Sequence, residues 1–331
     1  MSLLAVEDLT VSFPTADGLV EAVRGISFEV ESGKTLGIVG ESGSGKSVAT
    51  QTIVGLTQGA RISGRALFEG RDLLTMEAEA LRRIRGAQIA MIFQDPLSSL
   101  HPQYRVGWQI VEAIQAHEDT SKNDARQRAI ELLDRVGIPQ ADKRVDDYPH
   151  QFSGGMRQRA MIAMAIALNP RLLIADEPTT ALDVTVQAQI IELMKDLQTE
   201  FGTSIIMITH DLGVLAGLAD EVMVMYAGRA MERGPRRAVY RSPYHPYTQG
   251  LIQALPRRAR PKARLTPITG MPPSLIHPPR GCPFHPRCPH AFDRCRTEMP
   301  PLAAVEPSHI SACWLSAGDL PDLQSAGTGA S

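Results

Sequence analysis

The sequence predicts an α/β fold, in which a largely parallel sheet is covered by helices on both faces. The first observation is a set of short, continuous apolar runs, at 36–39, 89–93, 172–175 and 205–208, which are typical of buried parallel strands. The second is an amphipathic helical stretch, 184–201, between the last two runs. The apolar face expected for this helix consists of Val184, Ala188, Ile191, Met194 and Leu197.

Two further parts are expected beside this parallel core. Residues 3–13 and 20–30 alternate between apolar and polar side chains around an Asp17-Gly18 turn signal, which predicts an antiparallel β subdomain. Residues from about 97 to 168 are mostly helical in pattern and separate two of the apolar runs. They therefore predict a helical subdomain inserted into the core.

The distribution of proline marks a boundary in the chain. More than half of the 24 prolines fall between Pro256 and Pro307. Proline fixes φ and lacks a backbone N–H donor, so this stretch is expected to lack regular helix and sheet. We therefore divide the chain into a core domain, residues 1–234, and an extension, residues 235–331, which ends in a loose tail rich in Gly, Ser and Ala.

The composition is that of a globular protein without a membrane span. The chain has 331 residues, is 43% hydrophobic, and carries 34 Lys and Arg against 36 Asp and Glu, a net charge of −2. The near-neutral charge argues against a nucleic-acid partner, which usually calls for a basic excess. No apolar run approaches the ~20 residues of a membrane span, and we do not expect a secretory signal. A cytoplasmic location is expected, with any membrane contact peripheral.

Residues 40–47 read Gly-Glu-Ser-Gly-Ser-Gly-Lys-Ser and fit the phosphate-binding P-loop pattern. They follow the apolar run 36–39 and precede a helical run, 48–56, so backbone N–H groups and a helix N-terminus can surround a phosphate. Lys46 is expected to reach the β- and γ-phosphates, and Ser47 to ligate Mg²⁺. The nucleotide-binding residues predicted here are Gly40, Ser42, Gly43, Ser44, Gly45, Lys46 and Ser47.

Two carboxylates provide the second half of the expected site. Asp176 and Glu177 follow the apolar run 172–175, at the carboxyl edge of the sheet where ligands bind in open α/β folds. Asp176 is expected to hold Mg²⁺, directly or through water, and Glu177 to polarise the attacking water. The alternative is that both carboxylates merely cap the following turn; the P-loop favours the catalytic interpretation.

A P-loop alone leaves several classes of nucleotide-binding protein open. Ser153, Gly154 and Gly155 precede an apolar helical pattern, 160–168, and predict a second anion site at a helix N-terminus. With Phe152 and Met156 beside it, this segment resembles the signature motif of the nucleotide-binding subunits of ABC transporters. The resemblance implies ATP as substrate and a head-to-tail dimer, in which Ser153, Gly154 and Gly155 of one subunit contact the γ-phosphate held by the other.

Other positions match the motifs of that family in order. Gln94 lies at the glutamine-loop position, where it touches Mg²⁺ or the attacking water, and His210 at the switch-histidine position, where it hydrogen-bonds the γ-phosphate. Asp183 matches the loop that crosses the dimer interface, and Phe13 resembles the aromatic residue that stacks on adenine. A simple core role for Phe13 stays open, and the loop 96–102 is expected to face the membrane subunits.

All four cysteines lie near the end of the chain: Cys282, Cys288, Cys295 and Cys313. Clustered cysteines in a reducing compartment indicate a metal site more often than disulfides. The intervening stretches of five, six and seventeen residues lack the tight Cys-x₂-Cys knuckle of structural zinc, so we favour a [4Fe–4S] cluster over Zn²⁺, and Zn²⁺ over free thiols. His285, His290 and His309 are possible alternative ligands.

The segment 244–248, Tyr-His-Pro-Tyr-Thr, together with the cysteine-rich end resembles the extension of oligopeptide and dipeptide importers, which carry clusters in this region. The resemblance implies an ATPase that powers peptide uptake at the cytoplasmic face of the cell membrane. Its partners would be a second ATPase subunit, identical or paralogous, two transmembrane permease subunits and an extracytoplasmic solute-binding protein. An importer of nickel or another small solute, a soluble non-transport ABC ATPase, and a binding-only module are the alternatives.

Overall fold

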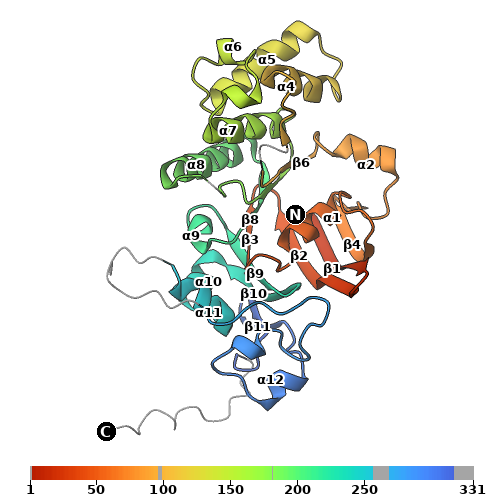
Figure 1. Cartoon of the computed structure of the whole chain (residues 1–331), viewed down its shortest axis with the longest axis vertical. Coiled ribbons are helices and arrows are strands. Elements are labelled where there is room, and N and C mark those ends of the chain that lie inside the picture. Colours follow the sequence, from red (N-terminus) through yellow and green to blue (C-terminus); the bar gives the residue numbers. More distant parts are fainter. Residues whose placement is uncertain (1, 96–98, 181, 256–267, 317–331) are drawn as a thin grey trace.

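A computed structural model describes residues 2–95, 99–180, 182–255 and 268–316. In this part of the chain a large sheet has the strand order β11-β12-β10-β9-β3-β8-β7-β6, and a smaller sheet has the order β2-β1-β4-β5 (Figure 1). The strands of the large sheet are β3 (Thr35–Val39), β6 (Ile89–Ile92), β7 (Leu172–Asp176), β8 (Ser204–Thr209), β9 (Glu221–Tyr226), β10 (Arg229–Pro235), β11 (Ala303–Glu306) and β12 (His309–Ser311).

The centre of the large sheet is parallel, as the continuous apolar runs predict. β3 pairs in parallel with β8 and β9, and β7 with β8 and β6. Successive side chains of one strand belong to two different buried clusters. Leu173 packs in the cluster shared with the helical subdomain, and Ile174 packs in the cluster shared with the small sheet. Both faces are therefore covered, which confirms the predicted α/β fold.

The antiparallel β subdomain is also confirmed. β1 (Ser2–Thr15) and β2 (Gly18–Glu31) form a long hairpin, and β4 (Arg61–Phe68) and β5 (Arg71–Asp72) complete the small sheet. Helix α1 (Lys46–Ile53) contacts β1 and β2, and α2 (Ala78–Ile84) follows the subdomain. This subdomain lies beside the start of the parallel sheet, next to the P-loop (Figure 1).

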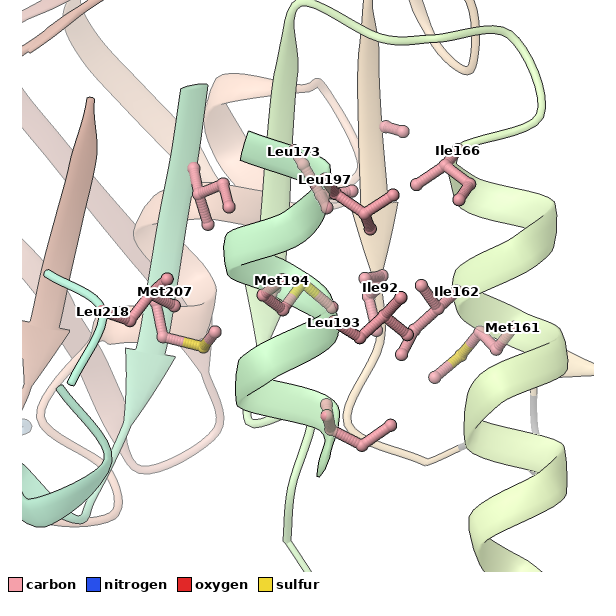
Figure 2. Packing of buried hydrophobic residues seen from close by; sticks show 14 of the residues in the cluster. Ile92, Met161, Ile162, Ile166, Leu173, Leu193, Met194, Leu197, Met207 and Leu218 are labelled. Carbon is pink, nitrogen blue, oxygen red and sulfur yellow. The ribbon is translucent and has the colours of Figure 1, made fainter. Parts of the chain in front are cut away.

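The helical subdomain lies between β6 and β7 in sequence and at one end of the molecule (Figure 1). Helix α7 (Gly154–Ala165) packs Met161 and Ile162, with Ile166 directly after its end, toward the sheet and α8 (Val184–Phe201) (Figure 2). This apolar packing anchors the helix that begins at the predicted second anion site. The helical elements are α4 (Val106–Gln115), α5 (Lys122–Arg135), α6 (Ala141–Arg144), the 3₁₀ helix η1 (Pro149–Gln151) and α7 (Gly154–Ala165).

Helix α8 spans Val184–Phe201, as predicted, but the predicted buried face is wrong in its first half. Val184 is 81% exposed and Ala188 is also exposed. The buried face consists of Ile190, Leu193, Met194 and Leu197, the last three of which are labelled in Figure 2. These residues follow the i, i+3, i+4, i+7 spacing, and in the first turn only Val186 packs, partly buried, against the apolar cluster.

The extension contains more regular structure than its proline content suggests. After α9 (Leu212–Leu215), the chain forms β9, β10, α10 (Arg236–Arg241) and α11 (Pro246–Gln253). The proline-rich stretch then contains η2 (His285–Arg287), α12 (Asp293–Thr297) and β11, and β12 follows it. The expectation that this stretch lacks helix and sheet was therefore wrong, because α12 and β11 fall in its proline-free intervals.

β12 pairs with β10, so the extension continues the central sheet. The proposed domain boundary at residue 234 lies within β10, and this division of the chain stays a prediction. The predicted loose tail beyond residue 316 and the part of the 96–102 loop formed by 96–98 lie outside the described residues.

Candidate functional site

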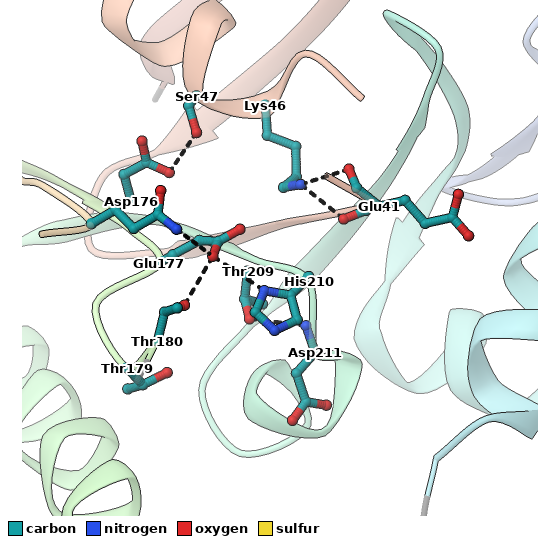
Figure 3. Close-up of polar contacts among 12 residues, drawn as sticks. Glu41, Lys46, Ser47, Asp176, Glu177, Thr179, Thr180, Thr209, His210 and Asp211 are labelled. Atoms are coloured by element: carbon teal, nitrogen blue, oxygen red, sulfur yellow. Dashed lines mark hydrogen bonds and ion pairs between the residues drawn. The ribbon is translucent and has the colours of Figure 1, made fainter. Parts of the chain in front are cut away.

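The P-loop forms the turn between β3 and α1. Gly45 precedes the helix with φ 97°, and a Cβ at Gly40 would lie 2.2 Å from the carbonyl oxygen of Met225, so both positions require glycine. Lys46 Nζ donates to the carbonyl oxygens of Gly40 and Glu41 at 2.8 and 3.0 Å (Figure 3). Burial lowers the pKa of Lys46, although the nearby carboxylates act in the opposite direction.

Ser47 and Asp176 meet beside this loop. Ser47 Oγ donates a hydrogen bond of 2.8 Å to Asp176 Oδ1, which joins the first turn of α1 to the end of β7 (Figure 3). Asp176 is buried, and this burial raises its pKa, while the Ser47 hydrogen bond lowers it. A hydroxyl and a carboxylate are hard oxygen ligands of the kind that Mg²⁺ prefers.

Glu177 is the meeting point of the remaining polar side chains. Its Oε2 accepts hydrogen bonds from Gln94 Nε2 at 3.2 Å and from Thr180 Oγ1 at 2.9 Å, and it lies 3.1 Å from His210 Nδ1 (Figure 3). Glu177 itself has φ 49°, in the left-handed region that residues other than glycine rarely adopt. The structure thus brings Gln94, Glu177 and His210 together from the ends of three neighbouring strands.

Thr180 is the member of this cluster to which the sequence assigned no role. Its hydroxyl lies three residues after Glu177 and donates to the same carboxylate oxygen as Gln94. The available signal was the short spacing, because Ser and Thr hydroxyls form local hydrogen bonds in turns.

The residues expected at a dimer interface lie apart from the P-loop. Ser153 caps α7, its Oγ accepts from the N–H of Met156 at 3.3 Å, and the side chain is exposed. Asp183 caps α8 by accepting from the N–H groups of Thr185 and Val186 at 3.0 Å each. α7 and the P-loop helix α1 occupy different parts of the molecule (Figure 1). Within one chain, Ser153 is therefore not brought to the phosphate site.

Comparison with known proteins decides the family. Residues 23–180 match the ABC transporter family, and residues 231–295 match the C-terminal region of oligopeptide/dipeptide transporters. The chain is 53% identical to the oligopeptide transport ATP-binding protein OppD of Salmonella typhimurium, over 94% of this chain and 93% of that protein. The chain belongs to the ATP-binding subunits of oligopeptide and dipeptide ABC transporters. As such it is an ABC transporter ATPase.

Other comparisons agree with this family. The dipeptide transport ATP-binding protein DppD of Bacillus subtilis (strain 168) is 51% identical over 95% of this chain and 94% of its own length. The solved dimeric structure of an ATP-binding cassette in a post-hydrolysis state, bound to ADP and Pi, superposes with a TM-score of 0.65 at 25% identity. The superposition covers 71% of this chain and 99% of the solved cassette.

The peptide-transporter extension carries the four cysteines. All four line one small cavity, together with His245, Phe284 and Trp314. Burial raises the pKa of Cys282 to about 12 and of Cys313 to about 11, and it raises the pKa of Cys288 as well. In the described part of the chain no group of three or more His, Cys, Asp or Glu side chains is arranged to hold a metal ion. The predicted metal-binding cluster is thus not formed as a ligand set.

Two of the alternative histidine ligands have other partners. His309 Nε2 lies 2.8 Å from Glu232 Oε1, and both side chains are fully buried. His285 Nδ1 lies 2.9 Å from the carbonyl oxygen of Cys282.

Phe13, in β1, is partly buried and packs against the apolar cluster of the β subdomain, so its assignment to adenine stays a prediction. No helix among the described residues is long and apolar enough to cross a membrane.

Proposed function

We propose that this ATPase hydrolyses Mg-ATP within a dimer of ATPase subunits and so powers the uptake of oligopeptides or dipeptides through an ABC importer. Its similarity to OppD and DppD over nearly the whole chain supports the peptide substrate. The observation that carries the hydrolytic part is the convergence of Gln94, His210 and Thr180 on the Glu177 carboxylate.

The P-loop side of the site would bind the nucleotide. Gly40, Ser42, Gly43, Ser44 and Gly45 would present N–H groups to the phosphates, Lys46 would contact the β- and γ-phosphates, and Phe13 would stack on adenine. Ser47 and Asp176, already in contact, would hold Mg²⁺ together with Gln94. The ion would neutralise charge on the β- and γ-phosphates.

Glu177 would accept a proton from the attacking water. Its carboxylate is only slightly exposed and is oriented by Gln94 and Thr180, which fixes the direction in which Oε2 can accept a proton. His210, whose side chain is 52% exposed, lies 3.1 Å from Glu177 Oε2 and would turn toward a γ-phosphate. Hydrolysis would then release the γ-phosphate, which His210 and the P-loop would both contact.

The site would be completed by a second subunit. Ser153, Gly154 and Gly155 lie on one chain at the N-terminus of α7, and the first two are exposed, so a partner's nucleotide can reach them. Asp183 and the exposed first turn of α8 would lie at the same interface. The dimeric cassette structure that this chain resembles supports such an assembly. The partner subunit is either a second copy or a paralogue.

Transport requires further partners, which the family implies. We propose two transmembrane permease subunits, an extracytoplasmic solute-binding protein and a peripheral position of this chain at the cytoplasmic face of the membrane. We keep the division into a nucleotide-binding domain, 1–234, and an importer-type extension, 235–331, as part of the proposal.

We also propose that Cys282, Cys288, Cys295 and Cys313 hold a [4Fe–4S] cluster, with Zn²⁺ as the alternative occupant. The support is the donor chemistry: four thiols line one small cavity, although in the described part of the chain they are not arranged as a ligand set. His245 lines the same cavity, and its buried Nε2 has no hydrogen-bond partner, while its Nδ1 accepts from the N–H of Tyr247. A neutral His245 therefore carries its proton on Nε2 and can donate it toward a sulfur. The group would cross-link segments that are distant in sequence.

The Glu177→Gln variant tests the hydrolytic role in the full importer, reconstituted in vesicles with its permease and binding-protein partners. We expect ATP turnover and peptide uptake to fall at least about 100-fold while nucleotide binding is retained, because glutamine keeps the size but cannot accept the proton. Glu192→Gln, at an exposed glutamate of α8, is the control. Unchanged turnover in Glu177→Gln would contradict the role of general base.

Iron, acid-labile sulfide and zinc analysis of protein purified without oxygen tests the cysteine site. We expect iron and sulfide in equal amounts with a broad visible absorption, both lost in the Cys295→Ser variant. A colourless, zinc-loaded protein would assign the site to Zn²⁺, and a metal-free folded protein would exclude both occupants.

A further inference from the structure

The extension contacts the P-loop through one arginine. Arg287 ends the 3₁₀ helix η2 and directly precedes Cys288. Its Nη1 donates to Glu41 Oε2 at 2.6 Å and its Nη2 donates to Glu41 Oε1 at 3.0 Å. Glu41 is the second residue of the P-loop, and only 6% of the Arg287 side chain is exposed. This is a bidentate, largely buried ion pair between residues that are 246 positions apart in the sequence.

The guanidinium is fixed from several sides. Its Nε donates to the carbonyl oxygen of Thr269 at 3.0 Å, Nη2 to that of Ile268 at 3.3 Å, and Nη1 to the hydroxyl of Tyr226 at 3.1 Å. The hydrogen bond to Glu41 is the largest of the effects that raise the pKa of Arg287. With its donors so engaged, Arg287 has little freedom to leave Glu41.

The backbone of Glu41 is held by the same extension. The N–H of Glu41 donates to the hydroxyl of Tyr247 at 2.9 Å. Tyr247 lies in α11, is fully buried, and packs against the rings of Tyr226 and Phe284, at 4.6 and 5.3 Å between centroids. The carbonyl of Glu41 in turn accepts from Lys46 Nζ. Whatever fixes Glu41 therefore also fixes the starting position of the lysine expected to contact the phosphates.

We propose that Arg287 is a positioning residue of the nucleotide site, which acts through Glu41 to hold the P-loop in its binding shape and to neutralise a carboxylate beside the phosphates. The inference rests on the proposed ATP-binding function and extends it, because it makes the peptide-transporter extension part of the nucleotide site. The role inferred for Arg287 affects nucleotide affinity, whereas the role proposed for Glu177 affects hydrolysis.

The test measures the dissociation constant of a fluorescent ATP analogue, with Mg²⁺, on the full chain in its complex. In Arg287→Met, the unpaired carboxylate of Glu41 would repel the phosphates, and we expect the constant to rise about tenfold. KM for ATP should rise similarly while kcat changes by less than about twofold. Arg296→Met, at an exposed arginine of the same extension, should leave both values unchanged.

A second substitution separates a charge effect from loss of folding. In the double variant Arg287→Met, Glu41→Gln the unpaired carboxylate is absent, so affinity should return to within about threefold of wild type. An affinity that is unchanged in Arg287→Met, or that falls further in the double variant, would overturn the inference. If the unmodified complex bound the ATP analogue normally but did not turn over ATP, the proposed hydrolysis would be contradicted. The inference about Arg287 would still stand, because it concerns nucleotide affinity.

The position of Arg287 next to Cys288 gives a further expectation. If the cysteine segment must fold for Arg287 to reach Glu41, Cys288→Ser should weaken nucleotide binding in the otherwise unmodified chain. The same substitution should add little in Arg287→Met, because the contact it disturbs is already lost. Independent, multiplying effects of the two substitutions would overturn this link between the cysteine segment and the P-loop.

Discussion

Glu232 and His309 lie 2.8 Å apart, with both side chains fully buried, where the extension meets the central sheet. Glu232 belongs to β10 and His309 to β12. The Glu232 carboxylate also accepts from the N–H groups of Tyr244 and His245, at 2.8 and 2.9 Å. One carboxylate therefore joins β10, β12 and the start of α11.

Glu232→Ala should detach the extension from the sheet. Removing the carboxylate leaves a buried N–H group, a partly buried N–H group and a buried imidazole without this partner, and we expect a loss of about 3–5 kcal/mol in the free energy of unfolding. Urea unfolding would measure it. Glu298→Ala, at an exposed residue in the same extension, should cost less than about 1 kcal/mol. Equal losses for the two variants would show that the buried carboxylate is not the anchor.

Gly40→Ala should damage the nucleotide site selectively. The added methyl would lie 2.2 Å from the carbonyl oxygen of Met225 and 2.7 Å from Ser44 Oγ, so the P-loop backbone must shift. We expect affinity for a fluorescent ATP analogue to fall at least about tenfold. Gly217→Ala is the matched control, because its methyl would meet no atom within 4 Å. Equal affinity of the two variants would contradict the tight fit of the loop.

Ser153→Asp should abolish turnover of the assembled importer without unfolding the subunit. Aspartate still caps α7, so the melting temperature should change little, but its charge would face the partner's γ-phosphate. We expect ATP turnover to fall at least about 100-fold. The same substitution at Ser121, which caps α5, should leave turnover within about twofold. Full turnover in Ser153→Asp would contradict the shared site.

Asp146 should make the helical subdomain sensitive to acid. A hydrogen bond from Arg126, opposed by some burial and assisted by Arg105, holds the pKa of Asp146 below its usual value of 3.8. Its contribution to stability is thus complete above pH 3.8 and is lost as the pH falls through the lower, folded value. The stability difference between wild type and Asp146→Asn should shrink below pH 3.8 in urea titrations. A difference that is constant with pH would refute this assignment.

Local patterns predicted the parts of the fold that local physics determines. Helix α8 begins and ends where predicted because Asp183 caps its start and Gly202, with φ 64°, ends it. The first half of its buried face was predicted wrongly, at Val184 and Ala188, because tertiary packing and not the helix alone decides which turns are covered, whereas Met194 and Leu197 are buried as predicted. The strand-end positions of Gln94, Glu177 and His210 were predictable, because parallel strands bring their carboxyl ends to one edge.

The contacts of the extension could not be predicted in this way. Arg287 and Glu41 are separated by most of the chain, and a single arginine between prolines has no periodicity that indicates a partner. The Glu232–His309 pair is 77 residues apart in sequence, and His309 appeared as a possible metal ligand. Only the three-dimensional arrangement shows that both side-chain pairs join the extension to the ATPase core.

The pairing of β12 with β10 also has a consequence for handling the protein. A strand without a neighbour offers a row of unsatisfied N–H and C=O groups to any other chain. Cutting the chain after residue 234 would bare one side of β10, so such a shortened cassette should self-associate through that side. The intact chain ends this side of the sheet with the short strand β11, and it is the form in which solubility should be preserved.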